Sequence, residues 1–200
     1  MDIEDKKIYS DKWFSYLQEQ ICNQFEKIEK DAKSHDKFVS TNWYKKNNKG
    51  GGTYKILKNG KIFDKVGVNK STVSGTFAKK FRKNILGAQK NGKYWASGIS
   101  VVAHMKNPKI PAIHFNTRFI VTSKNWFGGG IDLTPCLKDK KEENYFHSKL
   151  KKVCKENSKD YLKYKKWCDK YFFLPHRNEP RGIGGIFFDY EKNNWEKDFK

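Results

Sequence analysis

The sequence predicts an α+β fold built around an antiparallel sheet. Segments with strand character are grouped first and helical segments follow, and no internal repeat or Pro/Ser-rich linker divides the chain. The 200 residues suit one domain, which we expect to span residues 1–200. Aromatic residues make up 16% of the chain, which is ample for a sizeable core and unlike a disordered protein.

The first half of the chain predicts one helix and one hairpin. Residues 11–30 form an amphipathic helix, because apolar residues recur at three- and four-residue steps. Residues 45–52 are expected to form a polar, glycine-rich loop. Asn59-Gly60, between two apolar segments, is a strong hairpin signal. Residues 66–75 are interpreted as a loop or a short strand.

The second half predicts the rest of the sheet and two helices. Three strands are expected over residues 95–104, 111–122 and 126–133. Helices are expected over residues 140–155 and 158–173. A short apolar strand, IFFDY, begins at residue 186, and a polar segment follows it.

The net charge of +20 does not by itself indicate a nucleic-acid-binding protein. Only four of the 42 basic residues are Arg, and the Lys residues are spread along the whole chain. Nucleic-acid binders usually cluster their charge and use Arg for bidentate contacts. We therefore favour a solvated Lys-rich surface whose long-range field attracts anionic ligands, and an enzyme acting on an acidic small molecule. A Lys-based binder with stacking aromatics is the weaker alternative.

The cysteines and the N-terminal segment indicate a cytoplasmic protein. The cysteine spacing has neither a zinc-ribbon nor a redox motif. None of the four cysteines forms a CxxC pair. The first residues contain no apolar core of a signal peptide, and no segment is long enough for a transmembrane helix. Reduced thiols are the simple expectation.

Candidate chemistry begins in the predicted strand over residues 111–122. Alternate side chains of a strand share a face, so His114, Asn116 and Arg118 point the same way while the opposite face is largely apolar. Arg118 could bind a carboxylate with its planar fork, and His114 could move a proton near neutral pH. An ordinary solvent-exposed strand face is an equally good explanation of these residues taken alone.

The neighbouring predicted strands add further polar groups. Ser100 and His104 share one face of residues 95–104, and no G-x-S-x-G nucleophile motif surrounds the serine. In WFGGGIDLTP, three glycines remove side chains where the chain bends or something approaches closely, and Asp132 follows them. An isolated Asp in such a segment is more often solvated than functional.

Two further histidines have ordinary explanations. His147 lies beside the apolar stripe of its predicted helix, as satisfied core histidines do, and His176 opens the charged segment HRNEPRG. The histidines are scattered, so the fold would have to gather them to make a metal site. Neither glycine cluster, at residues 50–52 or 182–185, has the pattern of a nucleotide-binding loop.

Four long strings together give the chain a specific resemblance. They are GGGTYKILKNGKIFDKVGVNKSTVSG (50–75), SGISVVAHMKNPKIPAIHFNTRF (97–119), WFGGGIDLTP (126–135) and YKKWCDKYFFLPHRNEPRGIGGIFFD (164–189). In this order they resemble the oxygen-dependent coproporphyrinogen-III oxidases of haem biosynthesis. The resemblance implies a large antiparallel sheet between helices, a polyanionic tetrapyrrole substrate and O₂ as co-substrate. It implies no organic cofactor and no nucleic-acid partner.

Site residues are implied position by position. Ser100, Asn116, Thr117 and Arg118 resemble the family's substrate-binding positions. His114 resembles the position described as a proton donor, and Asp132 the acidic residue proposed to hold or deprotonate the pyrrole nitrogens. The positions that resemble the divalent-metal ligands of bacterial relatives are His104, His114, His147 and His176.

The chain departs from the family pattern at its end. Family members continue beyond the IFFD strand into a region with a further G-G-R substrate contact and the homodimer interface, whereas this sequence stops at Lys200. We therefore expect a domain that lacks the C-terminal part of the family fold. An inactive remnant that binds porphyrinogen or other polyanions is the alternative to an active enzyme. Phe115 and Thr117 also differ from the residues expected within the family's H-x-N-x-R string.

Overall fold

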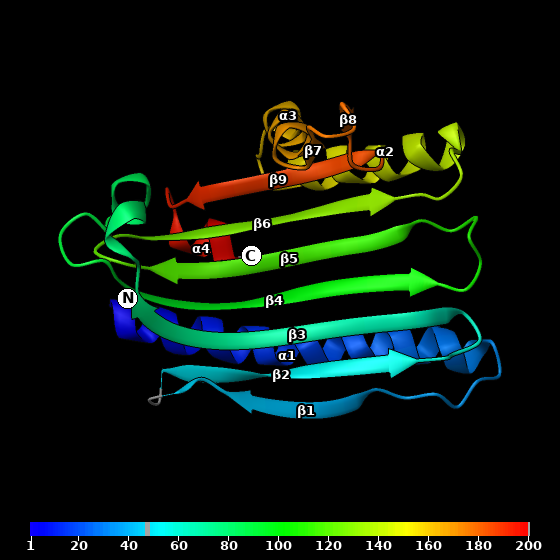
Figure 1. The fold of residues 1–200 in the computed structure, drawn as a ribbon, viewed down its shortest axis with the longest axis horizontal. Coiled ribbons are helices and arrows are strands. Elements are labelled where there is room, and N and C mark those ends of the chain that lie inside the picture. Colours follow the sequence, from blue (N-terminus) through cyan, green and yellow to red (C-terminus); the bar gives the residue numbers. More distant parts are fainter. Residues whose placement is uncertain (47–48, 200) are drawn as a thin grey trace.

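The computed structural model describes residues 1–46 and 49–199 and confirms the predicted α+β class. Its main feature is a seven-stranded sheet in the order β1-β2-β3-β4-β5-β6-β9, with every neighbouring pair antiparallel (Figure 1). The strands are β1 Val39–Tyr44, β2 Gly50–Lys58, β3 Phe63–Thr76, β4 Lys93–Met105, β5 Ala112–Val121, β6 Asn125–Thr134 and β9 Gly184–Glu191. Strands β1 to β6 each pair with the next strand in the chain. β6 then pairs with β9, and the segment that contains α2 and α3 lies between these two strands in the sequence.

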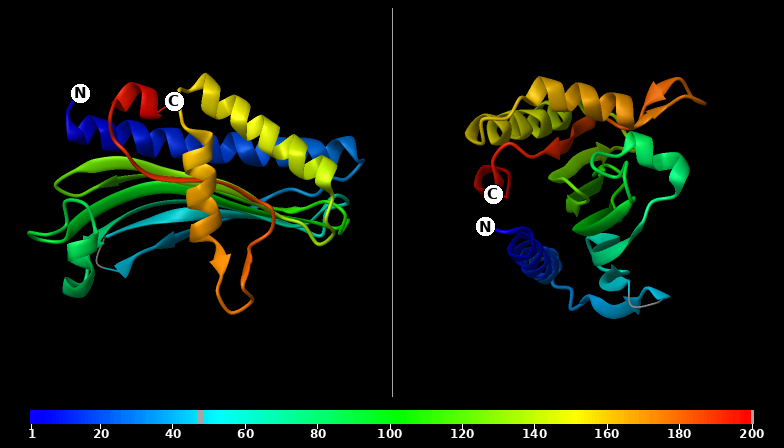
Figure 2. Two further views of the ribbon diagram at one scale, coloured as in Figure 1. Left: turned by 90° about the horizontal axis from the view of Figure 1, so that it is seen from above. Right: turned by 90° about the vertical axis from the view of Figure 1, so that its left-hand side faces the viewer.

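Helices cover one side of the sheet much more than the other. The helices are α1 Ile3–Asp31, α2 Lys140–Glu156, α3 Tyr161–Tyr171 and α4 Trp195–Phe199, with a 3₁₀ helix η2 at Lys79–Asn84. α1, α2 and α4 lie on one side, which we call the helix face (Figure 2). α3 passes the β9 edge and leads to the small hairpin of β7 Phe173–Leu174 and β8 Glu179–Pro180, on the opposite side (Figure 2). We call that opposite side the open face.

The main core lies between α1 and the sheet. Side chains of β4 alternate, so Ile99, Val101 and Ala103 are buried under α1 while Ser100 is exposed on the open face. The core cluster comprises Phe14, Cys22, Leu57, Phe63, Val66, Val68, Ile99, Val101, Ala103, Phe119, Val121 and Phe127. A second cluster of Leu150, Cys154, Tyr164 and Ile186 packs α2 and α3 against β9. The two clusters fix which face of each strand can meet a ligand.

Several sequence predictions need correction. The predicted helix over residues 11–30 begins at Ile3, because Asp2 caps it by accepting a hydrogen bond from the Asp5 N–H at 2.8 Å. Residues 66–75 belong to the long strand β3 rather than to a loop or a short strand. Glycines 50–52 of the predicted loop lie in β2, and residues 47–48 fall outside the described residues. A Cβ on Gly52 would collide with the Lys70 carbonyl of β3, which explains the glycine.

The prediction missed β1 and α4, as well as η2 and the short strands β7 and β8. β1 is an exposed edge strand that pairs with β2 alone, so its sequence carries little of the alternation that identifies half-buried strands. α4 lies in the segment interpreted as polar, and Lys159 anchors it with ion pairs to Glu191 at 2.7 Å and Asp198 at 2.6 Å. Burial opposes the charge of Lys159, but the two carboxylates outweigh burial and raise its pKa. Within the described residues, no helix is long and apolar enough to cross a membrane.

A buried carboxylate fixes the predicted hairpin at Asn59-Gly60. Glu29, near the end of α1, is fully buried and accepts hydrogen bonds from the backbone N–H groups of Lys61, Ile62 and Phe63 at 2.7, 3.0 and 2.8 Å. Gly60 leaves the room that the carboxylate occupies, because a Cβ there would collide with it. The hydrogen bonds therefore tie the β2–β3 turn to the last turns of α1.

Replacing Glu29 should destabilise the fold. Glu29→Ala leaves three partly buried N–H groups without an acceptor, and we expect a loss of about 2–4 kcal/mol in the free energy of unfolding. Urea unfolding followed by circular dichroism measures the loss. Glu156→Ala, at an exposed surface pair in α2, is the matched control and should change stability by less than about 0.5 kcal/mol. Equal stability of the two variants would contradict the anchoring role.

Candidate active site

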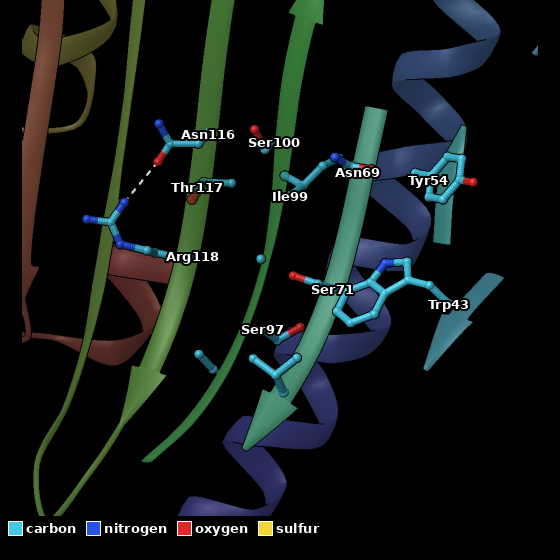
Figure 3. Close-up of a pocket in the computed structure, with 13 residues that line it drawn as sticks. Trp43, Tyr54, Asn69, Ser71, Ser97, Ile99, Ser100, Asn116, Thr117 and Arg118 are labelled. Atoms are coloured by element: carbon cyan, nitrogen blue, oxygen red, sulfur yellow. Dashed lines mark hydrogen bonds between the residues drawn. The ribbon is translucent and has the colours of Figure 1, made fainter. Parts of the chain in front are cut away.

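A pocket of about 540 Å³ occupies the middle of the open face (Figure 3). Strands β1 to β5 all contribute to it. Its lining consists of Trp43, Tyr54, Asn69, Ser71, Val73, Ala96, Ser97, Gly98, Ile99, Ser100, Asn116, Thr117 and Arg118. Arg118 is the single charged residue in this lining, which is otherwise made of amides, hydroxyls, aromatic rings and small residues. The pocket is therefore suited to a largely apolar ligand that carries an anionic group.

Strand register brings three of the predicted substrate-binding residues together. Asn116 pairs with Ser100 and Arg118 pairs with Gly98, so all of them belong to the open face. Arg118 Nη1 donates a hydrogen bond to Asn116 Oδ1 at 3.0 Å (Figure 3). Thr117 differs, because it pairs with the core residue Ile99, which directs its side chain to the helix face. Thr117 is nevertheless part of the pocket lining, and its contact with a substrate stays a prediction.

Arg118 has a second partner, which the sequence analysis missed. Its Nη2 donates to Asp189 Oδ2 of β9 at 2.9 Å, and its guanidinium lies 5.7 Å from the centre of the Phe187 ring. The side chain of Arg118 retains 30% of its exposure. The guanidinium is thus held from two sides and still accessible from the pocket.

His114 and Asp132 are neighbours across β5 and β6. They are direct register partners, and His114 Nδ1 lies 3.4 Å from Asp132 Oδ2. Asp132 is only 2% exposed, and Arg181 binds both of its oxygens through Nη2 at 2.8 and 2.9 Å. The Arg181 guanidinium in turn lies 3.8 Å from the centre of the Phe172 ring. This arrangement places a buried carboxylate, itself held by an arginine, beside the imidazole of His114.

The glycines of β6 make room for the protein's own side chains. A Cβ on Gly128 would collide with Asp189 Oδ1 and come within 3.1 Å of Arg118, and a Cβ on Gly130 would lie 3.1 Å from the Phe187 ring. Both glycines belong to the open face, since they pair with Arg118 and Asn116. Of the two explanations given for these glycines, a close approach is the one observed, and the approaching groups are Asp189, Arg118 and Phe187.

Comparisons with known proteins decide the family. The family model described as coproporphyrinogen III oxidase matches residues 10–200. Oxygen-dependent coproporphyrinogen-III oxidases of Rickettsia rickettsii (strain Sheila Smith) and Rickettsia africae (strain ESF-5) are each 52% identical over 206 residues, covering 100% of this chain and 73% of the relative. The enzyme of Rickettsia bellii (strain RML369-C) is 53% identical over 194 residues, covering 94% and 69%. The chain belongs to the coproporphyrinogen III oxidase family.

The four histidines suggested by the family resemblance do not meet in this coproporphyrinogen oxidase chain. His104 and His114 share the open face, His147 lies in α2 on the helix face, and His176 lies between β7 and β8. Among the residues that the structure describes, no group of three or more His, Cys, Asp or Glu side chains could hold a metal ion. The donors therefore do not fit a shared metal site within one copy of the chain.

His147 has the structural role that its position in the helix indicates. It is 8% exposed, and both ring nitrogens have partners: Nε2 lies 2.9 Å from the Ile183 carbonyl and Nδ1 2.9 Å from the Tyr161 hydroxyl.

Cys168, in α3, is fully buried. Burial, with a contribution from Asp132, raises the pKa of its thiol to about 12, so this cysteine is not a nucleophile at neutral pH.

Sequence reasoning missed the partners of the two main charged groups. Asp189 is the one charged residue of the predicted strand IFFDY, and Arg181 is one of four Arg residues in the chain, so each left a weak signal. Trp43, on the far side of the pocket, was missed because β1 was not predicted, and Tyr54 lies in the predicted hairpin but was not recognised as a pocket residue. Pairing between residues far apart in sequence requires the folded sheet.

Loss of Arg181 should destabilise the protein, because it leaves the buried Asp132 carboxylate without its main cation. We expect Arg181→Ala to lower the free energy of unfolding by about 3 kcal/mol. Arg177→Ala is the matched control, since Arg177 is 64% exposed and should cost less than about 0.5 kcal/mol. Denaturant titration at neutral pH measures both variants. Similar midpoints for the two would show that Asp132 does not depend on Arg181.

Proposed function

We propose that this chain catalyses the oxygen-dependent oxidative decarboxylation of coproporphyrinogen III. Two propionate side chains become vinyl groups, and the product is protoporphyrinogen IX of haem biosynthesis. The observation that carries the proposal is the pocket with a single charged group, Arg118, on the open face of a coproporphyrinogen oxidase fold. The relatives that match the chain are named as oxygen-dependent enzymes, which supports O₂ as the co-substrate.

Arg118 binds one propionate of the substrate in this proposal. Its planar guanidinium suits a carboxylate, and its environment is partly shielded from water, which strengthens a charge-assisted hydrogen bond. Asn116 and Ser100, beside it on the same face, can donate further hydrogen bonds to the substrate. The net charge of +20 attracts a polyanionic substrate over longer distances.

His114 moves the proton in the proposed reaction. Converting –CH₂–CH₂–COO⁻ to –CH=CH₂ releases CO₂, a proton and two electrons, and O₂ takes up the electrons with two protons to leave as H₂O₂. An imidazole near neutral pH can supply and collect such protons. Asp132, paired with Arg181 and facing His114 Nδ1, acts as a positioning residue for the imidazole. Asp132 is only 2% exposed and is bound by Arg181 at both oxygens, so the contact with pyrrole nitrogens that the family resemblance implies is not part of this proposal.

The oxidase proposal predicts a specific kinetic defect for Arg118→Ala. Loss of the charge-assisted contact should raise KM and lower kcat/KM roughly 10- to 100-fold. The assay follows aerobic turnover of coproporphyrinogen III by the fluorescence of protoporphyrin after oxidation, with an oxygen-free control. Arg177→Ala should behave as the unaltered chain does.

Product formation in the unaltered chain that does not depend on O₂, or none at all, would overturn the proposed activity. Turnover that is equal in Arg118→Ala and Arg177→Ala would leave the activity and remove Arg118 from the binding site.

A homodimer is a further part of the proposal, which rests on the family resemblance. Size-exclusion chromatography with light scattering distinguishes a dimer from the 23.6 kDa monomer.

A further inference from the structure

Strand β9 contains an irregularity directly opposite the pocket arginine. Phe188 pairs with Gly129 and Glu191 pairs with Phe127, so two residues of β9, Asp189 and Tyr190, oppose one residue of β6, Gly128. This is a β-bulge, a feature that redirects side chains and is frequent beside active sites. Gly128 itself pairs with Arg118 on β5. The bulge therefore brings an aspartate to the arginine across the intervening strand.

The backbone of the bulge is strained. Tyr190 has a φ of +62°, a left-handed conformation that is a genuine outlier for a bulky residue. Its ring packs on Trp126 with ring centroids 5.3 Å apart, and its N–H donates to Asp189 Oδ1 at 3.2 Å. Strained backbone of this kind is costly and persists where the surrounding structure determines it, commonly at functional sites.

Asp189 accepts hydrogen bonds from other donors in addition to Arg118. Its Oδ1 accepts from the Trp126 indole Nε1 at 2.8 Å, and its Oδ2 accepts from Arg118 Nη2 at 2.9 Å. The Asp189 side chain is 18% exposed, and Trp126 is 3% exposed. A side chain at Gly128 would occupy the space of the Asp189–Arg118 pair. The bulge, the glycine and the buried indole all serve the same contact.

This arrangement restricts a long and flexible side chain. Arg118 would otherwise lose much of its rotamer entropy when it binds a carboxylate. Asp189 and Asn116 bind its two terminal nitrogens, and Phe187 lies beside the guanidinium plane. Preorganising a binding group in this way improves affinity by removing an ordering cost from the binding step.

We infer that Asp189 is a positioning residue for Arg118, oriented by the bulge and anchored by Trp126, and that it presets the guanidinium for a substrate carboxylate. The inference rests on the proposed function and names a residue whose action passes through Arg118. The competing arrangement is an aspartate that occupies Arg118 and must be displaced by the substrate. The two arrangements predict opposite changes in substrate affinity when the Asp189 charge is removed.

The experiment compares Asp189→Asn, Arg118→Ala and the double variant in aerobic turnover of coproporphyrinogen III. Direct binding of coproporphyrin III, a stable tetracarboxylate probe, is measured in parallel by fluorescence. Asp64→Asn, which removes an equal charge from an exposed position in β3, is the matched control. Trp126→Phe is a second test that keeps the carboxylate and the aromatic bulk while removing the indole N–H. Thermal unfolding checks that each variant is folded.

We expect Asp189→Asn to raise KM and the dissociation constant of coproporphyrin III roughly ten-fold, with kcat changed less than about two-fold. Trp126→Phe should shift both in the same direction by a smaller factor. In the Arg118→Ala background, Asp189→Asn should have no further effect, because coupled residues are not additive. If Asp189 had a purely structural role, Asp189→Asn would weaken substrate binding by the same factor in the unaltered chain and in Arg118→Ala.

Unchanged or tighter binding in Asp189→Asn, or an equal loss in the Arg118→Ala background, overturns the inference. If Asp189→Asn does not fold, the inference is instead overturned when Trp126→Phe leaves both KM and probe binding unchanged. The proposed function fails separately, when the unaltered chain gives no oxygen-dependent product. Probe binding then still decides the role of Asp189, and a chain that neither turns over substrate nor binds the probe overturns both.

Discussion

The register of β4, β5 and β6, fixed by the α1 core, is the constraint on which the site depends. Apolar residues such as Val101 in β4 and Phe119 in β5 must face the side of the sheet that α1 covers. The residues that alternate with them along each strand must therefore face the opposite side. A slip of one residue would bury Arg118 and Asn116 under the helix and expose the core. The cost of that exchange, several apolar side chains brought into water at about 1.5–3 kcal/mol each, is far larger than any single polar contact in the site. Hydrophobic burial on one face thus decides the chemistry of the other.

Charges on the open face are arranged as pairs from separate strands and loops. Asp132 is almost completely buried, and burying a carboxylate is costly unless it is paired and hydrogen-bonded, which Arg181 provides. The side chains of Arg118 and Arg181 are similarly exposed, at 30% and 31%, but the Asp189 carboxylate is 18% exposed whereas Asp132 is 2% exposed. Arg118 also lines the pocket, while Asp189 binds it from β9. The first pair is built to stay together beside His114, and the second leaves the arginine able to meet an anion from solution.

The glycines of β6 show how the strand accommodates these pairs. Gly128 and Gly130 are the β6 residues that pair with Arg118 and Asn116 on the open face, and side chains from β9 fill the space above them. β9 reaches this position only after the excursion through α2, α3 and the β7–β8 hairpin, which also delivers Arg181 to Asp132. The helical segment between β6 and β9 is therefore part of the construction of the site as well as a cover for the sheet edge.

The sequence by itself determined the α+β class, the strands β4, β5 and β6, the helices α1 to α3 and the family. Alternation of apolar residues, turn residues such as Asn59-Gly60 and long characteristic strings are local signals, and they also put His114, Asn116 and Arg118 on one face. It could not identify β1, an edge strand without a buried face, or the course of β3 through residues interpreted as a loop. Only the tertiary structure decided that Asp189 and Arg181 are the partners of Arg118 and Asp132, and that His147 is a satisfied core residue. These partners lie 71 and 49 residues apart in the chain, and no local pattern specifies which strands meet after a long excursion.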